Sequence, residues 1–171
     1  MRHLTRRPIA LGLLVLLSLL HMSTGTRAFS SSGNASDASK LGSWDGVWIE
    51  GASDGLCVAV PDNTEGTWAI ETGCIDDALQ LWNFIDKGSG RYWIQNLGSG
   101  KCLTAGEWTL GSRVVQTTCS SSSSQYWSLA GTGNNFSISN GGECLGSRYL
   151  GGTKMMVKRG CPSKPNWLLL Y

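Results

Sequence analysis

The chain has 171 residues, with 14 Lys and Arg against 12 Asp and Glu, and a formal net charge of +2. Four of these cations and both histidines, His3 and His21, lie within the first 28 residues, so the remaining 143 residues carry a net charge of −2. This balance excludes the basic footprint that general nucleic-acid binding requires, and we expect no nucleic-acid partner.

The first 28 residues have the layout of a secretory signal peptide. A positive head with Arg2, Arg6 and Arg7 precedes an apolar stretch at residues 9–20, and the segment ends at Ala28 after small residues. The apolar stretch is shorter than the roughly 20 residues that a membrane-crossing helix needs. We therefore expect residues 1–28 to be removed, the protein to be secreted and no membrane span to remain. A retained membrane anchor is the alternative.

Residues 29–43 are rich in serine and are predicted to form a flexible leader, followed by one domain at residues 44–171. No part of this domain shows a sustained apolar period of 3.6 residues, which favours many short strands joined by turns and an all-β fold. A secreted chain without its two early histidines cannot use His-dependent catalysis or His-containing metal sites. We expect no metal and no cofactor.

The six cysteines divide the domain into three repeats. In chain order they form three successive pairs, and the second cysteine of each pair follows the first by 17 positions. Because this spacing recurs in all three pairs and secretion supplies an oxidising compartment, we predict one disulfide within each repeat. The predicted disulfides are Cys57–Cys74, Cys102–Cys119 and Cys144–Cys161.

A tryptophan follows the second cysteine of every repeat. Trp82 and Trp127 each end a Gln-x-Trp triplet that begins at Gln80 or Gln125, and Trp167 occupies the same place in the third repeat. Three repeats of about four strands cannot each bury a face alone, so we expect the three indoles to meet in a shared core. The Gln side chains are expected to bind backbone groups of the preceding turn.

Three such repeats with Gln-x-Trp triplets resemble the ricin B-type β-trefoil lectins. The resemblance runs from about residue 48 to residue 171 and is most specific at residues 98–105 and 55–60 and in the threefold cysteine spacing. It implies twelve strands with pseudo-threefold symmetry, in which three hairpins close a six-stranded barrel. It also implies a carbohydrate-binding module that binds a glycan or glycoprotein surface.

The positions that contact sugar in the resembled family are changed. Binding members carry an Asp two residues after the first cysteine, and an aromatic residue often lies two residues before the second. The Asp positions hold Ala59, Thr104 and Gly146, and the aromatic positions hold Thr72, Thr117 and Arg159. In the third repeat Pro165 stands at the Gln position. We therefore expect non-standard sugar contacts.

Other residues are candidates for carbohydrate binding. Trp108 and Tyr149 lie in loops after the first cysteines of repeats 2 and 3, and aromatic faces suit sugar rings. Asp62 and Asn63 can exchange hydrogen bonds with hydroxyl groups, and Gln80 and Gln125 belong to the triplets. The third repeat is also basic, since five Lys and Arg stand against Glu143 alone at residues 143–171, which favours a sialylated or sulfated glycan or an acidic partner.

Two alternatives to a lectin remain open. The first is a trefoil that has lost sugar binding and instead binds a protein partner, as a toxin's cell-binding subunit does. The binding subunits of cytolethal distending toxins show this resemblance, and Trp44 and Trp48 would then form an aromatic patch. The second is an enzyme, which we do not expect, because the only adjacent acid pair, Asp76 and Asp77, would diverge in a turn.

Overall fold

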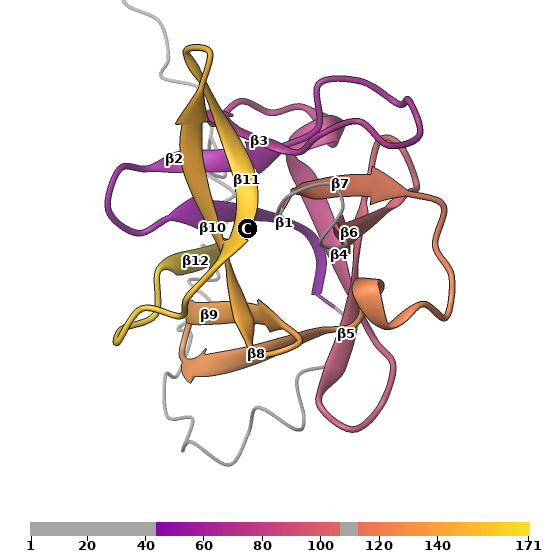
Figure 1. Cartoon of the computed structure of the whole chain (residues 1–171), viewed down its shortest axis with the longest axis vertical. Helices are drawn as coiled ribbons and strands as arrows, with labels where there is room; N and C mark the ends of the chain where they lie inside the picture. Colours follow the sequence, from indigo (N-terminus) through magenta and orange to yellow (C-terminus); the bar gives the residue numbers. More distant parts are fainter. Residues whose placement is uncertain (1–43, 107–112) are drawn as a thin grey trace, which may run out of the picture. The chain divides into compact units, whose positions relative to one another are not determined.

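The computed structural model describes residues 44–106 and 113–171 of the chain. Within these ranges the chain forms twelve β-strands in one hydrogen-bonded network (Figure 1). The predicted signal peptide and leader, and the loop that contains Trp108, lie outside the described residues. In the described part, no helix has both the length and the apolar character needed to cross a membrane.

Six strands form a closed barrel. They pair antiparallel around a complete ring, in the order β1, β4, β5, β8, β9, β12 and back to β1. Closure leaves no open sheet edge in the barrel. Their bounds are β1 (Trp44–Gly51), β4 (Leu81–Asp86), β5 (Arg91–Asn96), β8 (Trp127–Thr132), β9 (Asn135–Asn140) and β12 (Trp167–Leu170).

The other six strands form three hairpins, one in each repeat. They are β2 (Leu56–Ala59) with β3 (Ile70–Gly73), β6 (Cys102–Ala105) with β7 (Val114–Thr117), and β10 (Glu143–Leu150) with β11 (Thr153–Arg159). Equivalent contacts join each hairpin to the next, pairing Ile70 with Met155, Trp68 with Val115 and Arg113 with Val157. Repeat 1 therefore spans β1–β4, repeat 2 spans β5–β8, and repeat 3 spans β9–β12. The predicted β-trefoil with pseudo-threefold symmetry is confirmed.

The core is built from the same positions of each repeat. Trp82, Trp127 and Trp167 are buried, and each indole Nε1 donates a hydrogen bond of 2.8–3.0 Å to the backbone carbonyl of the residue after the first cysteine, Val58, Leu103 or Leu145. Because each large ring buries its apolar surface and also satisfies its polar atom, the tryptophans fill the core without an unpaired donor. The predicted shared core is confirmed.

All three predicted disulfides are present. Their Cα–Cα distances are 5.0 Å for Cys57–Cys74, 4.9 Å for Cys102–Cys119 and 4.8 Å for Cys144–Cys161. Each disulfide links the start of a hairpin to the segment that leaves it, so the hairpin and the following turn are fixed to one another within the repeat.

The third hairpin departs from the threefold symmetry. β10 and β11 pair over seven residue pairs, from Cys144–Arg159 to Leu150–Thr153, whereas β2–β3 and β6–β7 pair over four. Gly151 and Gly152 join the two strands with positive φ angles of 58° and 85°. Two adjacent residues of this conformation form the two-residue turn that matches the twist of paired strands. The result is the long orange and yellow hairpin of Figure 1.

Candidate functional site

The Gln of the first triplet holds a turn. Gln80 ends the short 3₁₀ segment η2 (Ala78–Gln80), and its side chain is buried. Its Oε1 accepts a hydrogen bond of 2.8 Å from the Ile75 N–H, and its Nε2 donates one of 2.9 Å to the Gly73 carbonyl. Both ends of the amide are therefore used within the protein.

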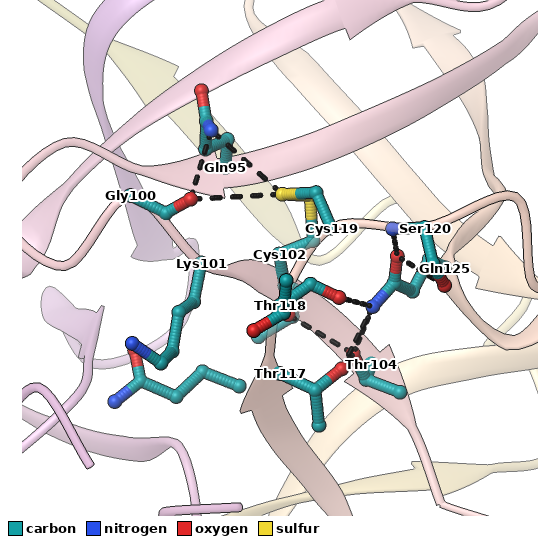
Figure 2. The surroundings of a disulfide bond; sticks show 12 residues. Gln95, Gly100, Lys101, Cys102, Thr104, Thr117, Thr118, Cys119, Ser120 and Gln125 are labelled. Atoms are coloured by element: carbon teal, nitrogen blue, oxygen red, sulfur yellow. Dashed lines mark hydrogen bonds between the residues drawn. A yellow bond between two sulfur atoms is a disulfide. The ribbon is translucent and has the colours of Figure 1, made fainter. Parts of the chain in front are cut away.

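Gln125 has the same role in repeat 2 and adds two threonine side chains. It ends the 3₁₀ segment η4 (Ser123–Gln125), and its Oε1 accepts a bond of 2.6 Å from the Ser120 N–H. Figure 2 shows its amide turned toward Thr104 and Thr117, whose hydroxyls lie 3.0 and 2.7 Å from Nε2 and share a hydrogen bond of 2.7 Å with each other. Nε2 also donates to the Thr118 carbonyl at 3.0 Å.

This network lies where the resembled family holds its sugar-contacting Asp and aromatic residue. Thr104 and Thr117 occupy those two positions in repeat 2, and their hydroxyls are bonded to each other and to Gln125. In repeat 1 the Asp position holds Ala59, which is buried and offers no polar atom. Ala59 thus serves internal packing in repeat 1, and Thr104 and Thr117 serve internal hydrogen bonding in repeat 2.

Repeat 3 holds its turn differently, because Pro165 replaces the Gln. The carbonyl of Asn166 accepts a hydrogen bond of 3.0 Å from the Ala52 N–H in repeat 1. Its side-chain Nδ2 lies 3.4 Å from the Leu145 carbonyl, which also receives the Trp167 indole. The turn is thereby fixed to a neighbouring repeat, and no Gln amide fills the space beside the third hairpin.

A pocket of about 360 Å³ lies in this region. The β10–β11 hairpin contributes half of the residues in its wall, and residues of repeat 1, of the turn before β12 and of the start of β12 complete it. Tyr149 lines the pocket and is 71% exposed, so the ring is available to a ligand. The wall of the pocket includes Tyr149, Gly146, Arg148, Arg159, Lys154 and Glu71.

Arg159 fills the space above Gly146. A Cβ atom added to Gly146 would lie 2.8 Å from Cγ of Arg159 and closer still to its Cδ. The missing side chain at Gly146 therefore makes room for the stem of Arg159. A guanidinium and a glycine thus stand where the resembled family carries an aromatic residue and an Asp.

Lys154 joins repeat 3 to repeat 1 beside this pocket. Its Nζ forms an ion pair with Asp54 and another, of 2.8 Å, with the buried carboxylate of Glu71. Burial raises the pKa of Asp54, but the Lys154 hydrogen bond, the Leu56 N–H and the charge of Lys154 outweigh it and hold that pKa below its ordinary value. Burial lowers the pKa of Lys154, and its two carboxylate partners more than reverse this effect, so the pKa is raised.

The remaining candidates that the structure describes lie apart from the repeat 3 pocket. Asp62 accepts hydrogen bonds at Oδ1 from the Thr67 hydroxyl (2.7 Å) and the Thr64 N–H (2.8 Å), which lower its pKa and hold the loop before β3. Asn63 is exposed in the same loop. Trp108 lies outside the described residues. The predicted residues within the described ranges therefore lie in three separate repeats, and none of them lines the pocket together with Tyr149.

Sequence reasoning missed the ion pairs of Lys154, because Lys154 and Asp54 are 100 positions apart and no local pattern relates them. It also missed the length of the third hairpin, although Gly151-Gly152 between two strand-like segments is a recognised signal for a tight turn.

Among the described residues, one group of metal-ligand types clusters within 4.8 Å, Glu50 with Cys57 and Cys74. Both sulfurs belong to the disulfide of repeat 1, so neither is a thiolate that can bind a metal ion.

Comparisons with known proteins agree with this architecture. The solved structure of the designed 3-fold symmetric protein ThreeFoil matches with a TM-score of 0.65 and 18% identity over 73% of this chain and 97% of its own. The cytolethal distending toxin from Actinobacillus actinomycetemcomitans matches with a TM-score of 0.62 and 17% identity, over 72% and 89%.

The Polyporus squamosus lectin, solved with the epitope Neu5Aca2-6Galb1-4GlcNAc, matches with a TM-score of 0.61 and 17% identity, over 75% of this chain and 48% of its own. These likenesses establish the fold. No curated protein sequence matches the chain. The model of the ricin-type beta-trefoil lectin domain matches residues 45–166, which is most of the chain. The chain therefore belongs to the ricin-type β-trefoil lectin family, whose members are carbohydrate-binding at the family level.

Proposed function

We propose that this protein is a secreted carbohydrate-binding module, not an enzyme, and that it binds a saccharide in the pocket beside the β10–β11 hairpin. The observation that carries the proposal is the pocket of about 360 Å³ with the exposed ring of Tyr149 in its wall. A rigid aromatic face provides apolar contact to a sugar ring at a small cost in conformational entropy.

The other two repeats support the choice of this pocket. In repeat 2 the threonine hydroxyls are bonded internally, and in repeat 1 the equivalent position is a buried alanine. Repeat 3 lacks the Gln amide, and its Asp position is a glycine, so its polar groups are not used in this way. The three disulfides support the prediction of a secreted protein that binds outside the cell.

A glycan array probed with the secreted protein tests this proposal. We expect Tyr149→Ala to reduce the signal about tenfold, since stacking on one aromatic ring contributes on the order of 1–2 kcal/mol. Tyr171→Ala is the matched control, because Tyr171 is 82% exposed and does not line the pocket. Loss of binding in Trp108→Ala with retention in Tyr149→Ala would instead place the site in the loop of repeat 2.

The protein-binding alternative predicts a silent array and a protein partner recovered by pull-down. The aromatic residues invoked for it are engaged within the fold. Trp44 packs edge-on against Phe84 and Phe136 at centroid distances of 5.9 and 5.3 Å, and the Trp48 Nε1 donates to the Ile75 carbonyl. No feature of these two tryptophans favours that alternative over saccharide binding.

A further inference from the structure

Two arginines of the repeat 3 pocket have no acidic partner. Arg148 and Arg159 both line the pocket and are exposed, and among the described residues no carboxylate forms an ion pair with either guanidinium. The other cations of the hairpin are paired, Lys154 with Asp54 and Glu71, and Lys158 with Glu143 at 3.2 Å. The two guanidiniums are thus the positive charges that the hairpin leaves available.

The strand register places both arginines on one face. Gly146 and Arg148 are two residues apart in β10, so their side-chain positions point to the same side of the hairpin. Arg159 pairs with Cys144, which belongs to this same alternating set, and its stem passes over Gly146. Arg148 and Arg159 therefore flank the glycine on the pocket side.

The carboxylate in the pocket wall, Glu71, is paired with a lysine, which reduces its repulsion of a bound anion. Glu71 is only 5% exposed, and its Oε2 lies 2.8 Å from Lys154 Nζ. Asp54 shares the same ammonium group. The acids are neutralised in part by Lys154, while Arg148 and Arg159 face the solvent side of the pocket.

We propose that this pocket takes an acidic saccharide, whose carboxylate or sulfate group binds Arg148 and Arg159. This inference rests on the proposed carbohydrate-binding function and specifies its ligand class. A planar guanidinium donates paired hydrogen bonds to a carboxylate or sulfate, and such charge-assisted bonds are about twice as strong as neutral ones. A neutral sugar offers hydroxyl groups that gain little from two cations.

The test measures dissociation constants of the secreted protein for four matched oligosaccharides: one sialylated, one carrying a uronic acid, one sulfated and one neutral. We expect at least one acidic saccharide to bind about tenfold or more tightly than the neutral one. Arg148→Gln and Arg159→Gln should each weaken that binding by about tenfold to a hundredfold and leave the neutral saccharide unaffected. Comparison of the three acidic saccharides distinguishes a carboxylate ligand from a sulfate.

Two further variants separate a built site from general attraction by positive charge. Lys164→Gln removes one positive charge from an exposed position of the same repeat outside the pocket and should leave acidic-saccharide binding unchanged. Gly146→Ala retains every charge but displaces the Arg159 stem, and it should weaken acidic-saccharide binding. Its φ angle is not positive and its near contacts are atoms of one flexible side chain, so the fold should tolerate the added methyl group.

The outcomes distinguish the two proposals. Suppose that the protein binds the neutral saccharide, that Tyr149→Ala weakens this binding, and that no saccharide loses affinity in Arg148→Gln or Arg159→Gln. This result would overturn the acidic-ligand inference and leave the lectin proposal standing. An absence of binding to every saccharide would overturn both. Equal affinity for an acidic peptide without sugar, or an equal loss in Lys164→Gln, would contradict a saccharide site built around the two arginines.

Discussion

At the scale of single residues, the triplet Gln holds the turn that leads into the core tryptophan in repeats 1 and 2. Gln80 and Gln125 each accept a bond from the backbone N–H five residues earlier and donate to the backbone carbonyl seven residues earlier. The same amide geometry recurs because the spacing between second cysteine and Gln is the same in both repeats. A polar residue with one acceptor and one donor end satisfies both backbone groups at once.

Gln125→Ala should therefore lower the free energy of unfolding by about 1–3 kcal/mol. The substitution removes the buried Gln125 amide and leaves the Ser120 N–H and the Thr118 carbonyl without this partner at a part-buried position, and an unsatisfied polar group that water does not fully reach costs about this much. Urea unfolding monitored by tryptophan fluorescence measures the change. Ser121→Ala, at an exposed position of the same turn, is the control and should differ from the unsubstituted protein by less than about 0.5 kcal/mol.

At the scale of the hairpin, a disulfide and a Gln amide both hold the segment after the second cysteine in repeats 1 and 2. Repeat 3 has the disulfide but lacks the Gln amide. The first two repeats have both a disulfide and a Gln amide. The third has its disulfide and the backbone bond from Ala52 to Asn166. Its longer hairpin therefore depends more on Cys144–Cys161 than the others depend on their disulfides.

Replacement of a disulfide by two alanines should cost about 3 kcal/mol in repeats 1 and 2 and more than this in repeat 3, because all three cystines close loops with a separation of 17 residues but no Gln amide holds the turn of repeat 3. Denaturant unfolding of the three double variants measures this. The Cys144→Ala/Cys161→Ala variant alone should also lose saccharide affinity, since the repeat 3 pocket uses this hairpin. Equal retention of affinity in all three variants would contradict the dependence of the pocket on this disulfide.

At the scale of the whole domain, ion pairs link the third repeat to the first where the hairpins meet. Lys154 of β11 reaches Asp54 between β1 and β2 and Glu71 of β3. The backbone contact of Met155 with Ile70 lies directly beside these pairs. The charges thus reinforce a contact that the pseudo-threefold symmetry repeats elsewhere without them.

These pairs predict a specific sensitivity to acid. The folded pKa of Asp54 lies below its ordinary value of 3.8, so its contribution to stability is complete well above pH 3.8 and is lost as the pH falls below that value. The free energy of unfolding, measured from about pH 5 to about pH 2, should decrease less steeply for Asp54→Asn than for the unsubstituted protein. Asp76→Asn lies at an exposed position without an ion pair among the described residues. In this variant the free energy of unfolding should fall with decreasing pH as steeply as in the unsubstituted protein.

The threefold pattern could be predicted from the sequence because each repeat has the same cysteine spacing and a tryptophan after its second cysteine. The equal cysteine spacing predicted the disulfides, and the tryptophans after the second cysteines predicted the shared core. Hydrophobic and turn positions within a repeat are close in sequence, so their spacing reports their structure directly.

The β-trefoil and its three disulfides could be read from the sequence alone, since they follow from residue types at repeating intervals. The tertiary structure was needed to show that Thr104 and Thr117 are bonded to Gln125 and that Arg159 crosses Gly146. It was also needed to show that Lys154 is paired across repeats, whereas Arg148 forms no ion pair with a described residue. Which charges remain available to a ligand depends on contacts between residues far apart in the chain. That is a property of packing, which spacing along one strand does not encode.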